Sequence, residues 1–176
     1  IHSMFSLNPF GIFGPSMCNF MRKEKKRMMD KIDAFVIDEV SMLRPDILDA
    51  MFWTLIHNKC NPLHKKQLIF VGDMKQLPVV LDDNARSVLF ERGYKGATFQ
   101  DAFHYKDLNV VDIELNEVLR QDDEEFISNL NIIRDGGKSE YFRQFVTDEY
   151  SGVILAPHNA TVQKYNEEGL NSIDSE

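Results

Sequence analysis

Two short apolar runs, separated by a segment of helix length, constrain the fold of this chain most strongly. Residues 34–37 read Ala-Phe-Val-Ile, and residues 68–71 read Leu-Ile-Phe-Val. Runs of this length that are rich in β-forming residues are typical of strands in a parallel sheet, where both faces are covered. Each run therefore predicts a short strand that is buried on both faces.

The segment between the two runs has the pattern of a helix over residues 45 to about 58. Pro45 suits the first turn, and Asp46 and Asp49 suit the positive end of the helix dipole. Apolar residues recur at helical spacing and form one face: Ile47, Leu48, Met51, Phe52, Leu55 and Ile56. Strand, helix and strand in this order form a βαβ unit, which predicts an α/β fold with a parallel sheet and a right-handed crossover.

The rest of the chain predicts further short elements. The basic run 22–27 suits a short exposed helix, and residues 84–92 and 99–104 suit two more. Alternating apolar residues predict a strand over 111–115, and Val153 begins another over 153–155. Residues 122–135 suit a helix with Phe126, Leu130 and Ile133 inward, ended by glycines. Asn159 is placed to cap a last helix, and the acidic stretch 135–152 reads as loop-rich.

Composition excludes several classes of protein. No apolar run approaches the roughly 18 residues of a membrane span, and two cysteines, Cys18 and Cys60, make neither a disulfide framework nor a zinc site. The net charge is −8. Residues 1–80 carry 11 Lys and Arg against 8 Asp and Glu, a net of +3, and residues 81–176 carry 9 against 20, a net of −11. This asymmetry fits either a side that faces a polyanion or two ordinary solvated surfaces.

Two adjacent carboxylates, Asp38 and Glu39, follow the first predicted strand. Ligands of open α/β sheets bind at the carboxyl ends of the strands. An Asp at such an end can hold Mg²⁺ through its water shell, and a Glu beside it can orient or deprotonate an attacking water. The alternative is a buried strand followed by an acidic loop that holds no metal.

The second predicted strand ends in Gly72-Asp73, and Gln76-Leu77-Pro78 follows. Parallel strands that end together would bring Asp38, Glu39, Asp73 and Gln76 to one rim. A glutamine amide can bond both a phosphate oxygen and a water, so Gln76 could detect a γ-phosphate. Otherwise Gln76 is a turn residue ahead of a proline.

Arg120 follows the predicted strand 111–115 and precedes four acidic residues, Asp122 to Glu125. It is either a residue that reaches a phosphate or a surface arginine paired with the acidic start of the next helix.

Taken in order, these motifs resemble the PIF/RecD-like group of superfamily 1 DNA helicases over nearly the whole chain. The family order runs through the end of motif Ia at 1–5 (Ile-His-Ser-Met-Phe), the Walker B motif at 36–42 (Val-Ile-Asp-Glu-Val-Ser-Met), motif III at 72–80 (Gly-Asp-Met-Lys-Gln-Leu-Pro-Val-Val), motif IV with its helix at 115–136, and the opening of a strand and helix at 155–166. Val79 replaces the usual second proline of motif III, and His158 replaces a usual threonine.

The resemblance implies a RecA-like P-loop NTPase fold: a three-layer parallel sheet, incomplete here, with the start of a second RecA-like domain. We expect residues 1–109 to belong to the first domain and 110–176 to the second, with ATP in the cleft between them. No Gly-x-x-x-x-Gly-Lys-Ser/Thr loop occurs in the chain. In the family that loop precedes motif Ia, so we expect an internal fragment that does not hydrolyse ATP alone.

The resemblance also implies ATP and Mg²⁺ as cofactors and assigns roles to individual residues. Asp38 would assist Mg²⁺ binding, and Glu39 would act on the hydrolytic water. Gln76 would sense the γ-phosphate, and Arg120 would reach it from the second domain. The residues expected near DNA are His2, Ser3, Phe5 and Asn159.

The implied function is that of an ATP-dependent DNA helicase core, which couples hydrolysis to translocation on single-stranded DNA and to duplex unwinding. We expect a monomeric, intracellular protein: cytoplasmic in a bacterium or phage, nuclear or mitochondrial in a eukaryote. Two rivals stay open. One is a DNA-dependent ATPase of the same fold that does not unwind, and the other is a degenerate ATPase-like domain that serves only as a binding module.

Overall fold

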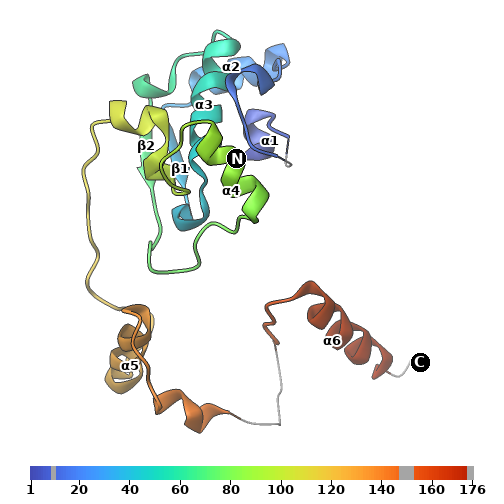
Figure 1. Ribbon diagram of the computed structural model, residues 1–176, viewed down its shortest axis with the longest axis vertical. Coiled ribbons are helices and arrows are strands. Elements are labelled where there is room, and N and C mark those ends of the chain that lie inside the picture. Colours follow the sequence, from blue (N-terminus) through green and yellow to red (C-terminus); the bar gives the residue numbers. More distant parts are fainter. Residues whose placement is uncertain (9–10, 147–152, 174–176) are drawn as a thin grey trace. The chain divides into compact units, whose positions relative to one another are not determined.

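A computed structural model describes residues 1–8, 11–146 and 153–173 of the chain. The chain forms two compact units, Ile1–Asp122 and Asp123–Glu176, which we call unit 1 and unit 2 (Figure 1). The expected domain boundary at residue 110 stays a prediction, since a division by contacts does not by itself define a RecA-like domain. None of the helices in the described ranges is long and apolar enough to cross a membrane.

The centre of unit 1 is the predicted βαβ unit. Strand β1 (Ala34–Ile37) and strand β2 (Gln67–Phe70) pair in parallel, with Ala34 opposite Gln67 and Ile37 opposite Phe70. Helix α3 (Pro45–His57) connects them, with Pro45 in its first turn as expected. The strand–helix–strand prediction and the parallel sheet are therefore confirmed.

Only one face of this sheet is covered by the described residues. Phe35 and Ile37 are each 5% exposed, whereas Val36 is 65% and Ile69 is 38% exposed. The prediction that both faces are buried is thus wrong for these strands, and the second covering layer of a three-layer arrangement is not formed here. In a sequence, the exposed face of a strand is recognised by a polar residue at every second position. Both runs contain only apolar residues, so the sequence could not show that one face is exposed.

The core forms around α3, which is buried on nearly all sides. Its buried residues include the apolar side chains expected for an inward face, although Ile56 is 59% exposed. Phe5, Phe13, Met29 and Phe35 belong to the same cluster. A helix that is apolar almost all round can be stable only when other elements surround it.

Two carboxylates inside this core tie distant loops to α3. Asp46 and Asp49 are both fully buried. Asp46 accepts two bonds from the Arg44 guanidinium, at 2.8 and 2.9 Å, and one from the backbone N–H of Phe13 at 2.7 Å. Sequence alone related these residues only to the helix dipole, and the structure gives them tertiary partners as well.

Asp49 holds the segment that follows the last helix of unit 1. Its carboxylate accepts from the Tyr94 hydroxyl and from the backbone N–H groups of Phe103 and His104, each at 2.9 Å. The His104 ring lies 2.7 Å away through Nδ1. Burial, and then the charge of Asp49, raise the pKa of the Tyr94 hydroxyl, which therefore stays protonated and donates.

The remaining helices agree in outline with the sequence pattern. The basic run begins a helix as expected, and Asp82 caps the helix after β2 by accepting from Ala85 N–H at 2.6 Å. The 99–104 segment forms 3₁₀ turns instead of an α-helix. The helices are α1 (His2–Phe5), α2 (Lys23–Lys31), α4 (Asp83–Glu91), α5 (Glu124–Arg134) and α6 (Asn159–Asn171), with 3₁₀ turns η1 (Pro15–Met17), η2 (Val40–Met42), η3 (Leu63–Lys65), η4 (Phe99–Asp101), η5 (Phe103–Asp107) and η6 (Tyr141–Phe145).

Three expectations about residues 110–176 are wrong. Residues 111–115 and 153–155 form no strand, and Ile113 is 82% and Leu155 92% exposed, because no strand among the described residues pairs with them. His158, not Asn159, occupies the cap of α6, and no side-chain cap bond forms. The inward face expected for α5 is not buried as a whole: Leu130 is 44% and Ile133 47% exposed. Of the three residues expected there, Phe126 packs on Phe142, with ring centroids 5.4 Å apart. Part of the 135–152 loop prediction, 147–152, lies outside the described residues.

Asp49→Ala should lower the free energy of unfolding by about 3 kcal/mol. The substitution leaves the Tyr94 hydroxyl and two backbone N–H groups without their acceptor, and each buried unpaired group costs about 1–3 kcal/mol. Urea unfolding followed by Trp53 fluorescence measures the change, since Trp53 is the single tryptophan and lies in α3. Exposed Glu91→Ala is the control and should stay within about 0.5 kcal/mol. Equal stability of the two variants would contradict the role of Asp49.

Candidate active site

The two adjacent carboxylates lie where β1 ends. Glu39 has a left-handed backbone, with φ 53° and ψ 45°, and it precedes the 3₁₀ turn η2. Asp38 Oδ1 accepts the Glu39 N–H at 2.9 Å, and both side chains are exposed. A left-handed conformation costs a non-glycine residue roughly 1–2 kcal/mol, and such strain is concentrated at functional sites. The turn at Glu39 thus holds two carboxylates in solvent at the end of the strand.

Backbone hydrogen bonds beyond the strands hold the two strand ends side by side. The Val71 N–H donates to the Ile37 carbonyl at 2.8 Å, and the Val40 N–H donates to the Val71 carbonyl at 3.0 Å. Gly72 comes next, and a Cβ at that position would lie 2.8 Å from the Val40 nitrogen. Only glycine allows this approach without a shift of the backbone. The segment after Glu39 and the segment after β2 therefore form one structural unit.

The loop after β2 is held by Asp73. Its Oδ1 accepts the Lys75 N–H at 2.9 Å, and its carbonyl accepts the Gln76 N–H at 3.0 Å. This is the pattern of an Asx turn, in which a short side chain fixes the backbone two residues on. Asp73 follows β2 as expected. Its carboxylate fixes the turn that carries Gln76.

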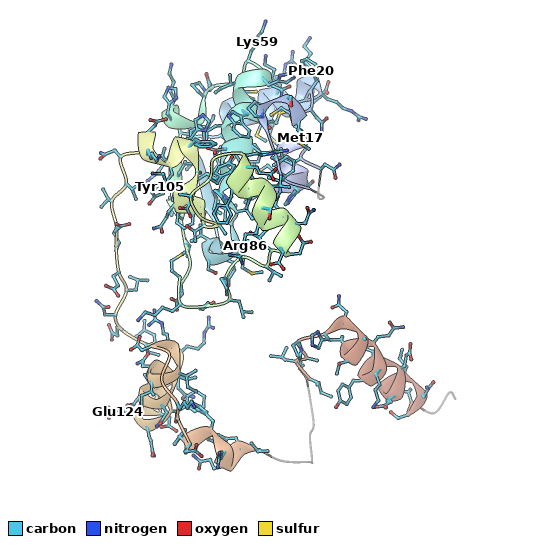
Figure 2. All side chains as sticks on the ribbon, viewed as in Figure 1. Met17, Phe20, Lys59, Arg86, Tyr105 and Glu124 are labelled. Atoms are coloured by element: carbon cyan, nitrogen blue, oxygen red, sulfur yellow. The ribbon has the colours of Figure 1, made fainter. Side chains whose placement is uncertain are left out.

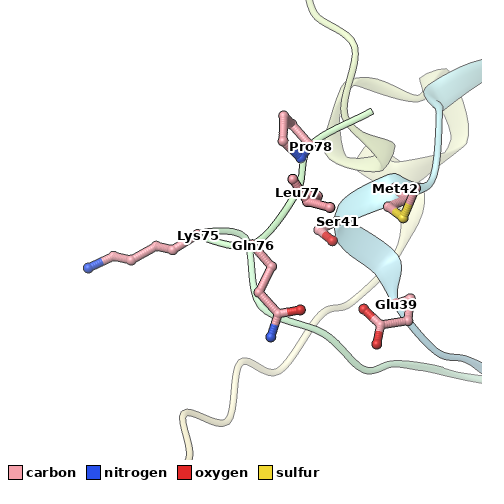
Figure 3. A pocket seen from close by; sticks show the side chains of 7 residues that line it. All are labelled: Glu39, Ser41, Met42, Lys75, Gln76, Leu77 and Pro78. Atoms are coloured by element: carbon pink, nitrogen blue, oxygen red, sulfur yellow. The ribbon is translucent and has the colours of Figure 1, made fainter. Parts of the chain in front are cut away.

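An open hollow of about 700 Å³ lies between these two segments. Glu39 and Gln76 reach toward the same space from opposite sides, and Lys75 points away from it (Figure 3). The structure thus brings two of the predicted site residues together. The lining consists of Glu39, Ser41, Met42, Lys75, Gln76, Leu77 and Pro78.

The chemistry of this lining suits the handling of a water beside a phosphate. An ionised carboxylate accepts a proton or a hydrogen bond, and an amide both donates and accepts. The described residues include no group of three or more His, Cys, Asp or Glu that could hold a metal ion on their own. The exposed carboxylate of Asp38 does fit Mg²⁺, because this ion keeps several waters and takes only one or two protein carboxylates.

Ser41 is a residue of the hollow that sequence reasoning did not single out. It is 3% exposed, and its Oγ has no hydrogen-bond partner among the described residues. The sequence contained it only as part of the Ser-Met that trails the two carboxylates. Its burial depends on the loop after β2, which is 34 or more residues away in the chain, so no local pattern could have revealed it.

Arg120 and Asn159 do not belong to the lining of the hollow. Arg120 lies in an exposed stretch without helix or strand near the end of unit 1, and its neighbour Leu119 is 82% exposed. Asn159 is the exposed first residue of α6 in unit 2. Their expected roles stay predictions.

The three residues expected near DNA in unit 1 lie on α1 and differ in accessibility. Ser3 is exposed, and its carbonyl accepts from Lys25 Nζ at 2.6 Å. His2 is half-buried, and burial lowers the pKa of its ring. The Phe5 ring is 1% exposed and packs on Phe35 at 5.4 Å. Phe5 is therefore a core residue, and its ring is not available for stacking on a base.

Gly72→Ala should destabilise unit 1 by about 2 kcal/mol, because the added Cβ meets the backbone of Val40 and must push the two strand ends apart. Thermal unfolding followed by Trp53 fluorescence measures the loss. Gly169→Ala is the matched control. It adds the same methyl group in α6 of unit 2 with no atom within 4 Å, so the unfolding of unit 1 that Trp53 reports should stay at the parental level. A neutral Gly72→Ala would show that the close approach is not required.

A family model, curated relatives and solved structures all indicate the same protein family for this chain. The family model described as PIF1-like helicase matches residues 1–144. The ATP-dependent DNA helicase Pif1 of Campylobacter jejuni is 26% identical over 89% of this chain, and PIF1 of Saccharomyces cerevisiae is 35% identical over 66%. A Bacteroides Pif1 crystal structure in complex with ADP-AlF3 and ssDNA is 30% identical over 99% of the chain, with a TM-score of 0.87.

The chain is shorter than these relatives. It spans 37% of the Campylobacter protein and 44% of the Bacteroides chain. The agreement in fold extends over the α/β unit that carries Asp38, Glu39 and Gln76. Because the family model covers well over half of the 176 residues and the fold agrees with it, this chain belongs to the PIF1-like helicase family.

Proposed function

We propose that this chain supplies the hydrolytic part of the nucleotide site in an ATP-dependent DNA helicase. The observation that carries the proposal is the meeting of Glu39 and Gln76 at one hollow, on two strand ends that backbone bonds and Gly72 hold together. The similarity to Pif1 helicases supports ATP as the nucleotide and DNA as the substrate.

Within this site each residue has a distinct task. Glu39 accepts a proton from, or orients, the water that attacks the γ-phosphate. Gln76 faces the same space and can bond the γ-phosphate and that water together. Asp38 would hold Mg²⁺, and this ion would supply positive charge against the phosphates. Asp73 fixes the turn of Gln76, so this amide is placed in advance.

Arg120 is proposed to act on the γ-phosphate from outside the hollow. It would belong to the second RecA-like domain, residues 110–176, which would close on the first, residues 1–109, when ATP binds. A guanidinium has five donors in a rigid fork that matches phosphate oxygens, and Lys does not reproduce this geometry.

His2, Ser3 and Asn159 are proposed to contact single-stranded DNA. Burial lowers the pKa of the His2 ring and so favours its neutral form, which can hydrogen-bond to DNA. The solved relatives bound to ssDNA and to forked dsDNA support both kinds of partner. We propose a monomer that works inside the cell where DNA is present. One of these relatives is described with two coordinating helicases.

Two rivals make different predictions. A DNA-dependent ATPase without strand separation would keep the hydrolytic residues and lose only unwinding. A non-catalytic binding module would tolerate changes at Glu39.

Glu39→Gln in the full-length protein should reduce ATP hydrolysis by about 10²- to 10⁴-fold while nucleotide binding stays near the parental level. The substitution keeps the shape of the side chain and removes the proton acceptor. Steady-state hydrolysis and nucleotide titration measure the two properties. Glu91→Gln, on the exposed end of α4, is the control and should be neutral. Parental hydrolysis by Glu39→Gln would support the binding module.

Arg120→Ala should abolish DNA-stimulated hydrolysis and unwinding, by roughly 10³-fold or more, and keep stability and DNA binding. Arg143→Ala is the matched control, since Arg143 is 80% exposed and pairs with Glu140 at 2.6 Å. An exposed pair of that kind contributes about 0–1 kcal/mol, so the control should behave as the parent does. Normal unwinding by Arg120→Ala would show that Arg120 too is an ordinary surface arginine.

A further inference from the structure

Phe20 lies on the surface of unit 1 between η1 and α2, and its side chain is 80% exposed. Figure 2 shows Phe20 and Lys59 at the same end of unit 1. A single exposed apolar residue is ordinary on a protein surface. Phe20 differs from that ordinary case in the rigidity of its backbone, in its ring partner and in the charge around it.

The backbone on both sides of Phe20 is fixed by the buried side chain of Asn58. Asn58 Oδ1 accepts the Met21 N–H at 2.6 Å, and its Nδ2 donates to the Asn19 carbonyl at 3.0 Å. The same Nδ2 donates to the Thr54 carbonyl at 2.9 Å, and this bond anchors the Asn58 side chain to α3. Asn19 also donates from Nδ2 to the Ser6 carbonyl at 2.8 Å. The Phe20 ring is therefore exposed on a loop whose backbone is fixed by hydrogen bonds.

Phe20 shares its surface position with the ring of His57, the last residue of α3. The two ring centroids are 4.4 Å apart and the planes are tilted by 44°. His57 is also exposed, so the pair presents aromatic surface to solvent at the end of the helix. Lys59 follows two residues later with a left-handed backbone, φ 55°.

Positive charge is concentrated beside this ring pair. Residues 22–31 contain six Lys and Arg against one Glu and one Asp, a net of +4 in a chain whose net charge is −8. Lys25 Nζ bonds the Ser3 carbonyl and, at 2.8 Å, Ser6 Oγ. This ties α2 to α1, which carries the proposed DNA residues His2 and Ser3. The basic helix is thus continuous with the proposed DNA-binding region.

A held aromatic pair beside clustered positive charge fits single-stranded DNA better than a protein partner. Every base presents a π-face that stacks on aromatic side chains, and a basic surface follows the backbone phosphates. We propose that Phe20 and His57 stack one base of single-stranded DNA, while Lys59 and the exposed basic residues of α2 bind the adjoining phosphates. This inference rests on the proposed function, because it extends the DNA path that begins at His2 and Ser3.

The test compares Phe20→Ala with Phe90→Ala in the full-length protein. Phe90 is 48% exposed on α4, which makes it a matched aromatic control. The probe is a thymidine oligonucleotide that carries one fluorescent base analogue. Phe20→Ala should bind it roughly 5- to 150-fold more weakly, the range for loss of one stacked base. Phe90→Ala should bind as the parent does, and Phe20→Trp should restore affinity.

A second pair of variants tests the phosphate contact. Lys59→Ala should reduce the slope of log Kd against log salt by about 0.7, the value for one phosphate contact on a single strand. Arg86→Ala, an exposed cation on α4, should leave the slope unchanged. Thermal unfolding of all variants should match that of the parent, since none of the substituted side chains is buried.

The outcomes separate this inference from the proposed function. Parental affinity of Phe20→Ala, together with weaker binding by His2→Ala, would overturn the Phe20 site and leave the proposed function in place. Equal losses in Phe20→Ala and Phe90→Ala would also overturn the site, since the effect would not be specific. If the parent protein bound neither single-stranded nor duplex DNA, both proposals would fail. A loss confined to duplex DNA would overturn the single-strand assignment.

Discussion

The hydrogen-bonded ladder between β1 and β2 determines where the side chains that line the hollow lie. The ladder does not stop at the strand ends, since Ile37, Val71 and Val40 continue it into the two following loops. Each loop carries one side chain to which the proposed function assigns a part in hydrolysis, Glu39 on one and Gln76 on the other. A shift of one strand against the other would move both loops out of register. The short parallel pairing is thus the constraint on which the geometry of the hollow depends.

Helix α3 supplies the rigid support for that ladder, and it does so with buried charge as well as apolar packing. Removing a carboxylate from water is costly unless hydrogen bonds replace the lost hydration. Asp46 and Asp49 meet this requirement with several donors each, some from residues more than 50 positions away. Three of these donors are the backbone N–H groups of Phe13, Phe103 and His104, so the carboxylates fix the course of the chain as well as side-chain positions.

The sequence was informative where regular elements determine the position of a residue, and uninformative where burial or pairing depends on partners that no regular pattern specifies. Parallel strands that end together were enough to predict that Glu39 and Gln76 meet. The alternation at Ile113 predicted a strand that did not form, because alternation states which face would be buried and not which strand would pair. The burial of Phe5 and Ser41 and the buried bonds of Asp49 all involve residues far away in the chain. No pattern within a short window could have predicted them.

The electrostatics of the hollow indicate what a nucleotide would need in order to bind there. Glu39 lines it and Asp38 lies beside it, so a triphosphate would approach two carboxylates. Of the seven lining residues only Lys75 is a cation, and it points away from Glu39 (Figure 3). Two unit charges about 4 Å apart interact by roughly 1 kcal/mol in water and about 4 kcal/mol near a protein surface. Lys75 can offset only one of the two negative charges of Asp38 and Glu39, so a bound triphosphate would need further cations from outside the lining. Under the proposed function, Mg²⁺ held by Asp38 and the guanidinium of Arg120 would supply this charge, and hydrolysis would then be conditional on their arrival.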